Sequence, residues 1–331
     1  MPVKKNNPSS REFMRAVVFD GRLRFSQNFP IPEIPKDWVR NRVQFAGICG
    51  TDMEILNGYQ QFKGVLGHEF VGIVDQCGFP EWVGQRVVGQ INVSCGSCRW
   101  CREGLERHCA RRQVLGIHGL NGCMADYCIL PVSNLLRVPS FFTKEQAVLM
   151  EPLSAACRIL DQIQLAGGEH VVILGDGPLG ILCAWGLGTV VARVTLVGHH
   201  QHKLAVANWR SIKTVSGDLE ALYGADVVVE ATGSTNGLSE ARALCRPGGT
   251  IVLKSTVSAA ETVDLSPLVI KEQILLGSRC GNFEAALKLM KRYPDMPLQR
   301  LITASYPVEQ AKEAFGRASG SDALKVALHL N

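Results

Sequence analysis

Four cysteines lie in one short stretch of the chain, SCGSCRWCREGLERHC, at Cys95, Cys98, Cys101 and Cys109. Their spacing, C-x2-C-x2-C-x7-C, brings four thiolates close enough to surround one Zn²⁺ tetrahedrally. Because a closed shell of four sulfur ligands leaves no coordination position for a substrate, such a zinc has a structural role. The sequence therefore predicts a structural zinc lobe over residues 92–112.

The composition limits the function classes to consider. The chain has 331 residues, 46% hydrophobic and 20% charged, which is typical of a globular protein large enough for two domains. The net charge of +5 is too small to indicate a nucleic-acid partner. No apolar run reaches the roughly 18 residues of a membrane span. Twelve cysteines without the spacing of a disulfide framework predict reduced thiols and a cytoplasmic protein.

The pattern of residues divides the chain. Residues 1–13 lack an apolar signal segment and are expected to form a disordered extension. Residues 14–150 contain short alternating runs such as FVGIVDQ, which predict a β-rich domain. From Glu151 an amphipathic helix is predicted, and strand-like segments (HVVIL, RVTLV, ADVVVE, GTIVL) then alternate with helical ones. This alternation predicts an α/β fold with a parallel sheet covered on both faces.

A glycine-rich turn, GDGPLG, follows the first of these strands and opens a helix. In that context G-x-G-x-x-G indicates a dinucleotide site, because the glycines permit a tight turn and the helix N-terminus attracts pyrophosphate. The predicted cofactor-binding residues of this turn are Gly175, Gly177, Pro178, Leu179 and Gly180.

The end of the second strand bears on the choice of cofactor. An NAD site normally carries an acid about 20 residues after the glycine turn, but residues 181–217 contain no Asp or Glu. Small and basic residues stand there instead and favour a 2′-phosphate, namely Gly198, His199, His200 and Lys203. NADP is therefore the expected cofactor, although a solvated loop without strong preference between NADP and NAD stays an alternative.

A second set of metal-ligand residues precedes the cysteine lobe. Cys49 stands two residues before Thr51, and His68 and Glu69 are adjacent in the segment GVLGHEFVG. Glu151 opens the second domain. Mixed sulfur, nitrogen and oxygen ligands with one open position are typical of a catalytic zinc, which polarises a carbonyl or stabilises an alkoxide. His68 and Glu69 can both reach one ion only if the backbone bends between the flanking glycines.

Taken together, the segments CGTD, GHE, EPLS, GDGPLG and VVVEATGS and the four-cysteine lobe resemble the zinc-containing medium-chain dehydrogenase/reductase family. The polyol, threonine and glucose dehydrogenase branch is the most similar, and the resemblance runs from residue 14 to the end. It implies a GroES-like catalytic domain (14–150), a Rossmann domain (151–285) and a C-terminal return to the catalytic domain (286–331), with zinc between the domains.

The resemblance also implies roles for single residues. Cys49 and His68 correspond to zinc ligands, Glu69 to the third ligand, and Glu151 to a movable fourth carboxylate that binds directly or through water. Thr51 corresponds to the hydroxyl that takes the alcohol proton. Many relatives carry a proton-relaying His three residues later. This chain has Glu54 there, so the relay through Glu54, water or the cofactor ribose stays open.

Further candidates follow the later strands, whose carboxyl ends bind ligands in such folds. Four of them are expected near the ribose and nicotinamide: Thr232, Gly233, Ser255 and Thr256. Arg279 is expected either to reach a cofactor phosphate or to be solvated.

The predicted function is reversible hydride transfer between NAD(P) and a secondary alcohol, polyol or sugar, with two zinc ions per chain. Zinc-free quinone or enoyl reductases share the architecture and stay an alternative. Another is a redox sensor that binds nucleic acid or protein through the basic zinc lobe. The resemblance further implies a homodimer or homotetramer. No nucleic-acid or membrane partner is expected for the dehydrogenase.

Overall fold

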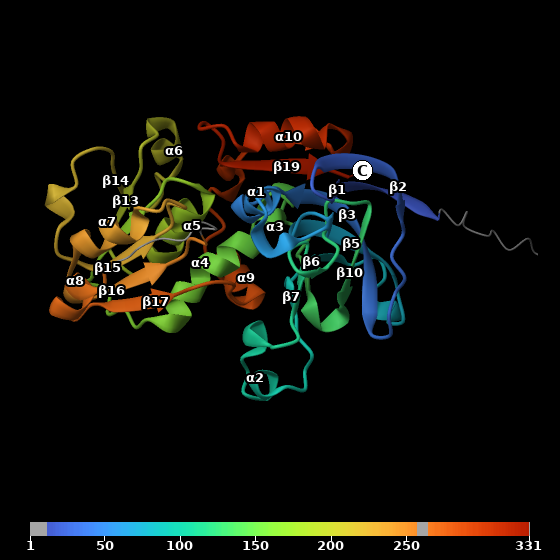
Figure 1. Cartoon of the computed structure of the whole chain (residues 1–331), viewed down its shortest axis with the longest axis horizontal. Helices are drawn as coiled ribbons and strands as arrows, with labels where there is room; N and C mark the ends of the chain where they lie inside the picture. The colour runs from blue at the N-terminus through green and yellow to red at the C-terminus, as the bar shows by residue number, and fades with distance from the viewer. Residues whose placement is uncertain (1–11, 257–263, 331) are drawn as a thin grey trace, which may run out of the picture.

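A computed structural model describes residues 12–256 and 264–330 and contains two lobes side by side (Figure 1). Residues 1–11 of the predicted extension lie outside the described ranges. The first strand, β1, begins at Phe13, one residue before the expected start of folded structure. None of the helices in the two described ranges is long and apolar enough to span a bilayer.

The first lobe is built from two main sheets. A three-stranded sheet has the order β2-β1-β4, and a seven-stranded sheet has the order β11-β6-β5-β3-β19-β18, with β10 paired to β3. Residues alternate along β3, where Val39, Val43 and Phe45 are buried and Arg42 is exposed, as expected for a strand with one face on the core. The strands are β1 (Phe13–Phe19), β2 (Leu23–Pro30), β3 (Trp38–Gly47), β4 (Gly64–Val65), β5 (Glu69–Cys77), β6 (Arg86–Gly89), β10 (Tyr127–Pro131), β11 (Leu135–Arg137), β18 (Ile302–Pro307) and β19 (Lys325–His329).

The cysteine lobe projects from this domain (Figure 1). It is framed by a small sheet of β7 (Asn92–Val93), β8 (Gln113–Leu115) and β9 (Gly119–Leu120), and it carries the short helix α2 (Arg99–Arg102). So small a unit has little apolar core of its own, which is the usual reason for a structural metal.

The second lobe contains a six-stranded parallel sheet in the order β14-β13-β12-β15-β16-β17. Its strands are β12 (His170–Leu174), β13 (Arg193–Val197), β14 (Lys213–Val215), β15 (Ala225–Glu230), β16 (Cys245–Leu253) and β17 (Ile274–Gly277). The first strand, β12, lies between the second, β13, and the fourth, β15. The order in which successive strands are added to the sheet therefore reverses at β12, while all strands stay parallel. This is the doubly wound order in which ligands bind at the carboxyl ends of the strands.

Helices cover both faces of that sheet. Val171 and Ile173 of β12 pack into one apolar cluster with α5, whereas Val172 and Leu174 pack into another with α7. Alternation along a strand that is buried on both faces confirms the predicted parallel sheet of a Rossmann domain. Together with the β-rich first lobe, it gives the predicted α/β class. The helices of this lobe are α4 (Met150–Gln162), α5 (Pro178–Leu187), α6 (Gln201–Val206), α7 (Gly237–Leu244), α8 (Ser266–Ile270) and α9 (Phe283–Arg292).

One apolar cluster joins the two lobes. Phe45 and Val71 from the seven-stranded sheet belong to the same cluster as Leu153 of α4 and Trp185 of α5. All four side chains are nearly inaccessible. The chain passes between the lobes through α3 (Lys144–Val148) and α4. The relative position of the lobes is therefore fixed by shared core packing as well as by the connecting chain.

The chain ends by returning to the first lobe. Helix α10 (Ala311–Ala318) packs on β18 and β19, and β19 pairs antiparallel with β3. This pairing places Lys325, at the start of β19, beside Glu69, at the start of β5. Lys325 Nζ donates to Glu69 Oε1 at 2.8 Å and lies 2.7 Å from Oε2, and both side chains are buried. Burial by itself lowers the pKa of Lys325, but the acids around it, Glu69 first, raise that pKa above its usual range.

Replacing Lys325 by Met should destabilise the protein strongly. The Glu69 carboxylate would then be buried without its cation, and removing one partner of a buried ion pair costs about 3–5 kcal/mol. The measurement is the free energy of unfolding from a denaturant titration. Lys325→Arg should recover much of the loss. Arg99→Met breaks the exposed Arg99–Glu103 pair and should change stability little, so equal effects at the two sites would contradict the assignment.

Candidate active site

Cys49, His68 and Glu69 come together at the base of the first lobe. One ligand atom from each lies within 4.8 Å of the others. Cys49 caps the N-terminus of α1 (Gly50–Leu56). His68 precedes β5 and only Glu69 lies in the strand, because the chain turns at Gly67 with φ +92°. His68 and Glu69 can therefore face the same site although they are adjacent in the sequence, as the flanking glycines suggested.

The three side chains fit a cation. His68 is 3% exposed and Glu69 is fully buried. Glu69 Oε2 lies 2.7 Å from Lys325 Nζ, and His68 Nδ1 lies 3.4 Å from Asp52 Oδ1. A thiolate, an imidazole and a carboxylate are the donor set of a catalytic zinc. The site can therefore hold Zn²⁺ with a coordination position left for substrate.

Two neighbours position these ligands. Asp52 Oδ2 accepts the backbone N–H of Cys49 at 2.8 Å, which holds the turn at the start of α1. Its Oδ1 lies 3.4 Å from His68 Nδ1. Burial lowers the pKa of His68, but Asp52 and Cys49 outweigh that and raise it well above the usual value. Gly47 leaves room for Glu69, since a Cβ there would lie 2.3 Å from Oε2.

Thr51 and Glu54 both lie on α1, three residues apart and so on one helix face. The Thr51 hydroxyl is 3.8 Å from Cys49 Sγ, so it stands directly beside the candidate ligand. Both side chains are half-buried. A hydroxyl at that place can contact an oxygen bound to the metal, and Glu54 is the next ionisable group along the same face.

Glu151 is placed near the three ligands but is not gathered with them. Its side chain is buried in the first turn of α4, and its carboxylate lies outside the set of ligand atoms within 4.8 Å of one another. Burial is the main cause that raises the pKa of Glu151 to about 7, and Glu69 raises it further. This position suits a carboxylate that approaches a metal only on movement or through water.

A buried lysine that sequence analysis missed holds the helix of Glu151 in place. Lys254 Nζ, at the end of β16, donates to the carbonyls of Ala155 at 2.7 Å and Arg279 at 3.1 Å. Gly281 completes the contact, because a Cβ there would lie only 1.7 Å from Ser154 O. Helix α4 is thus joined to the chain that follows β17.

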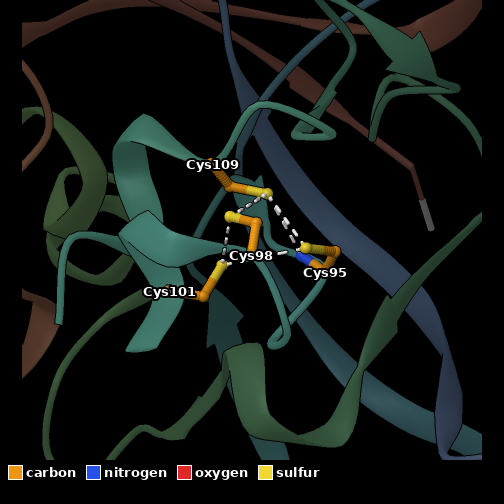
Figure 2. A group of neighbouring side chains, drawn as sticks. All are labelled: Cys95, Cys98, Cys101 and Cys109. Carbon is orange, nitrogen blue, oxygen red and sulfur yellow. Dashed lines mark hydrogen bonds between the residues drawn. The ribbon is translucent and has the colours of Figure 1, made fainter. Parts of the chain in front are cut away.

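The four cysteines of the lobe form the second cluster (Figure 2). Four sulfur–sulfur distances are 3.5, 3.5, 3.8 and 3.9 Å. A tetrahedron of sulfurs, each about 2.3 Å from a central zinc, has edges of about 3.8 Å, so the geometry fits a Zn(Cys)4 site. Arg111 and the backbone N–H of Cys95 donate to these sulfurs, as expected around thiolates. None of the twelve cysteines forms a disulfide bond.

The glycine turn has the tight geometry that a dinucleotide loop requires. Gly175 has φ +114°, and a Cβ there would lie 2.5 Å from Ala231 O. A Cβ on Gly180 would lie 1.9 Å from Gly175 O, so the turn and the helix touch through backbone alone. Gly177 caps α5, and Pro178 and Leu179 form its first turn, which leaves the first N–H groups of α5 free for an anion.

The end of β13 differs from the predicted phosphate site. The carboxylate of Asp176, inside the glycine turn, accepts the backbone N–H groups of His199 and His200, and the His200 imidazole lies against it. Lys203 is only 8% exposed. The predicted preference for NADP is not confirmed, because a carboxylate occupies the donors that a 2′-phosphate would use.

Three of the candidates after the later strands form one network. Glu230, buried at the end of β15, accepts from the hydroxyls of Thr232 at 2.6 Å and Ser255 at 3.0 Å. Ser255 in turn accepts the N–H of Gly233 at 2.8 Å. Thr256 is exposed and is the last residue described before the gap at 257–263. Glu230 was not predicted, although its place at the end of a buried strand was a usable signal.

Arg279 lies against the zinc lobe. Its guanidinium donates to Arg107 O at 2.6 Å. The side chain therefore links the Rossmann domain to the lobe, which sequence analysis did not predict. Its contact with a cofactor phosphate stays a prediction.

Two family models match the chain in tandem. Residues 35–140 match the alcohol dehydrogenase GroES-like domain, and residues 144–330 match the glucose dehydrogenase C-terminus. The chain is 28% identical over 328 residues to L-threonine 3-dehydrogenase of Legionella pneumophila (strain Philadelphia 1), which covers 92% of this chain and 95% of the relative.

Solved structures agree. An alcohol dehydrogenase of Escherichia coli CFT073, complexed with NADH, has a TM-score of 0.87 at 25% identity and covers 96% of this chain and 100% of its own. A zinc-binding dehydrogenase of Sinorhizobium meliloti 1021, bound to NADP, has a TM-score of 0.86 at 26% identity with the same coverage. The chain belongs to the zinc-containing medium-chain dehydrogenase/reductase family.

Proposed function

We propose that this protein is a zinc-dependent dehydrogenase that reversibly oxidises a secondary alcohol of the polyol or sugar type with a nicotinamide cofactor. The observation that carries the proposal is the Cys49, His68 and Glu69 cluster, in which one ligand atom from each residue lies within 4.8 Å of the others. The L-threonine 3-dehydrogenase that it resembles also acts on a hydroxyl-bearing carbon. An assay of alcohols, polyols and sugars with NAD and NADP, read as nicotinamide absorbance, tests it.

In this mechanism Cys49, His68 and Glu69 would hold the catalytic zinc, and Glu151 would be a fourth carboxylate that binds directly or through water. When bound, zinc polarises the substrate oxygen and the nicotinamide takes up the hydride. The Thr51 hydroxyl accepts the proton of the alcohol while it passes its own proton to Glu54, to water or to the cofactor ribose. The glycine turn and α5 bind the pyrophosphate.

The chain's remaining site residues orient the cofactor. Thr232, Gly233 and Ser255 are fixed by Glu230, so their polar groups are ordered before a ligand arrives. A preordered set of polar groups loses less conformational freedom on binding, which favours one position of the nicotinamide half. Thr256 and Arg279 complete the proposed cofactor residues.

The two alternatives explain less of the geometry. A zinc-free quinone or enoyl reductase has no use for Cys49, His68 and Glu69 ligand atoms gathered within 4.8 Å of one another. A nucleic-acid-binding sensor would use the arginines of the zinc lobe, but Arg99, Arg102 and Arg111 are engaged within the protein. Salt-sensitive binding of DNA or RNA in a gel shift would favour the sensor.

We also propose a homodimer or homotetramer joined along β17. This strand is an edge of the six-stranded sheet, and apolar side chains gather on it and on α8. Ile270 is 81% exposed, Val269 is 74% exposed and Ile274 is 56% exposed. An exposed apolar edge strand is a liability unless another chain covers it, and a second copy does so by symmetry.

Metal analysis should find two zinc ions per chain, one for each cluster of ligands. Cys49→Ala should lose one zinc together with alcohol oxidation and keep its fold by circular dichroism. Cys101→Ala removes one thiol from the other cluster and should lose the other zinc, with a clear loss of thermal stability. Alcohol oxidation by Cys49→Ala at the rate of the unmodified enzyme would refute the catalytic assignment.

Thr51→Val should lower kcat by about 10²–10⁴-fold, the range for loss of a proton-transfer group, because the volume is kept and the hydroxyl is lost. Zinc content should not change, since Thr51 is not a ligand. Thr51→Ser restores a hydroxyl and should recover most of the rate. If the Val variant keeps its kcat, the alcohol proton leaves by another route.

Ile270→Asp should convert the oligomer to a monomer, because a charge cannot be buried in an apolar interface without a partner. Light scattering coupled to size exclusion measures the mass. Val83→Asp, at an exposed apolar residue of the first lobe, is the matched control and should leave the oligomer intact. An unmodified protein that is already monomeric would refute the assembly.

A further inference from the structure

Asp176 has a contact that its place in the sequence does not suggest. It is the second residue of the glycine turn after β12, yet its carboxylate lies at the end of the neighbouring strand, β13. Oδ2 accepts the backbone N–H of His199 at 2.8 Å and that of His200 at 2.7 Å. His200 Nδ1 lies 3.0 Å from the same oxygen. Three donors therefore fix one carboxylate at this corner.

Gly198 makes this contact possible. It is the first residue after β13, and a Cβ on it would lie 2.3 Å from Asp176 Cβ and 2.4 Å from Oδ2. Any larger residue at position 198 would displace the carboxylate. The absence of an acidic side chain on β13 and the presence of Asp176 in the turn are thus two parts of one arrangement.

The corner is where this fold recognises the adenosine ribose. In dinucleotide-binding domains of this topology an acid from the end of the second strand binds the ribose hydroxyls, and a basic side chain nearby accepts a 2′-phosphate. Here β13 is the second strand and carries no acid, but a carboxylate is present at its end all the same. It has reached that place from the glycine turn.

The charge of this carboxylate is retained. Asp176 is 8% exposed, and although burial raises its pKa, the donors from His200 and His199 outweigh burial and hold the pKa below its usual value. Several of the donors predicted to receive a phosphate are already used by Asp176, namely the backbone N–H groups of His199 and His200 and the His200 ring. The His199 imidazole is exposed, and Lys203 is 8% exposed, as is Asp176.

We propose that Asp176 replaces the missing acid of the second strand and makes the cofactor site selective for NAD(H) over NADP(H). This inference rests on the proposed function, because it concerns that enzyme's cofactor. A 2′-hydroxyl can donate to the carboxylate, whereas a 2′-phosphate would place its own negative charge beside that of the carboxylate. The sequence-based preference for NADP is reversed by the carboxylate.

The experiment compares two fragments that differ only in the 2′-phosphate. ADP-ribose and 2′-phospho-ADP-ribose are titrated into the zinc-loaded full-length protein by calorimetry at pH 8, where histidine side chains are ordinarily neutral. ADP-ribose should bind at least about tenfold more tightly, which corresponds to one lost hydrogen bond and an added repulsion. For Asp176→Asn the two affinities should differ by less than about threefold, mainly through tighter binding of the phosphorylated fragment.

Matched controls separate this effect from a change in net charge or in folding. Asp218→Asn makes the same charge change at an exposed acid of the same domain and should keep the preference. Glu220→Gln makes the same charge change at a second exposed acid and should also keep it. If Asp176→Asn has a lowered Tm, the ratio of the two affinities for the unmodified protein still decides the question.

Tighter binding of the phosphorylated fragment by the unmodified protein would overturn the inference, as would an unchanged ratio in Asp176→Asn. Both results leave the dehydrogenase proposal standing, because either cofactor carries hydride. Failure to oxidise any alcohol, with ADP-ribose still preferred, would refute the proposed substrate chemistry and not the role of Asp176. If neither fragment binds, both proposals fail.

Discussion

The structure of the first lobe depends on how it balances buried negative charge. Asp52 and Glu69 lie together under the sheet, with Cys49 and Glu151 nearby, and Lys325 is the cation paired with Glu69 there. Isolated buried charges are too costly to persist, so they must be paired or bind a metal. His68 Nδ1, beside Asp52, and Glu69 Oε2, beside Lys325, belong to the same cluster of ligand atoms as Cys49. The proposed zinc would add a further positive charge to this cluster.

The sequence was sufficient wherever the partners are close in the chain. The spacing of four cysteines predicted their cluster, and the glycine turn after a strand predicted the backbone contact of Gly175 with Ala231. The α/β class and the parallel sheet followed from alternating patterns. In each case a local rule of geometry decides the outcome, and tertiary contacts only have to agree with it.

Contacts between distant segments could not be predicted in this way. Lys325 meets Glu69 across 256 positions, and Arg279 meets Arg107 across 172. Strand pairing and domain packing set these contacts, and no periodicity or spacing encodes them. The expectation about the cofactor was limited in the same way. The acid was sought about 20 residues after the turn, where it usually stands, but Asp176 reaches the same corner from inside the turn because Gly198 leaves space.

The catalytic site is also a property of the whole chain and not of one domain. The three proposed ligands come from the first lobe, Glu151 comes from α4, and Lys325 comes from the last strand. Lys254 and Gly281 join α4 to the chain after β17, so the position of Glu151 is set by the Rossmann domain. A shift of that domain would move Glu151 relative to the other ligands. Helix α4 therefore links the Rossmann domain to the proposed metal site, and the C-terminal return supplies the Lys325 contact that holds Glu69 in place.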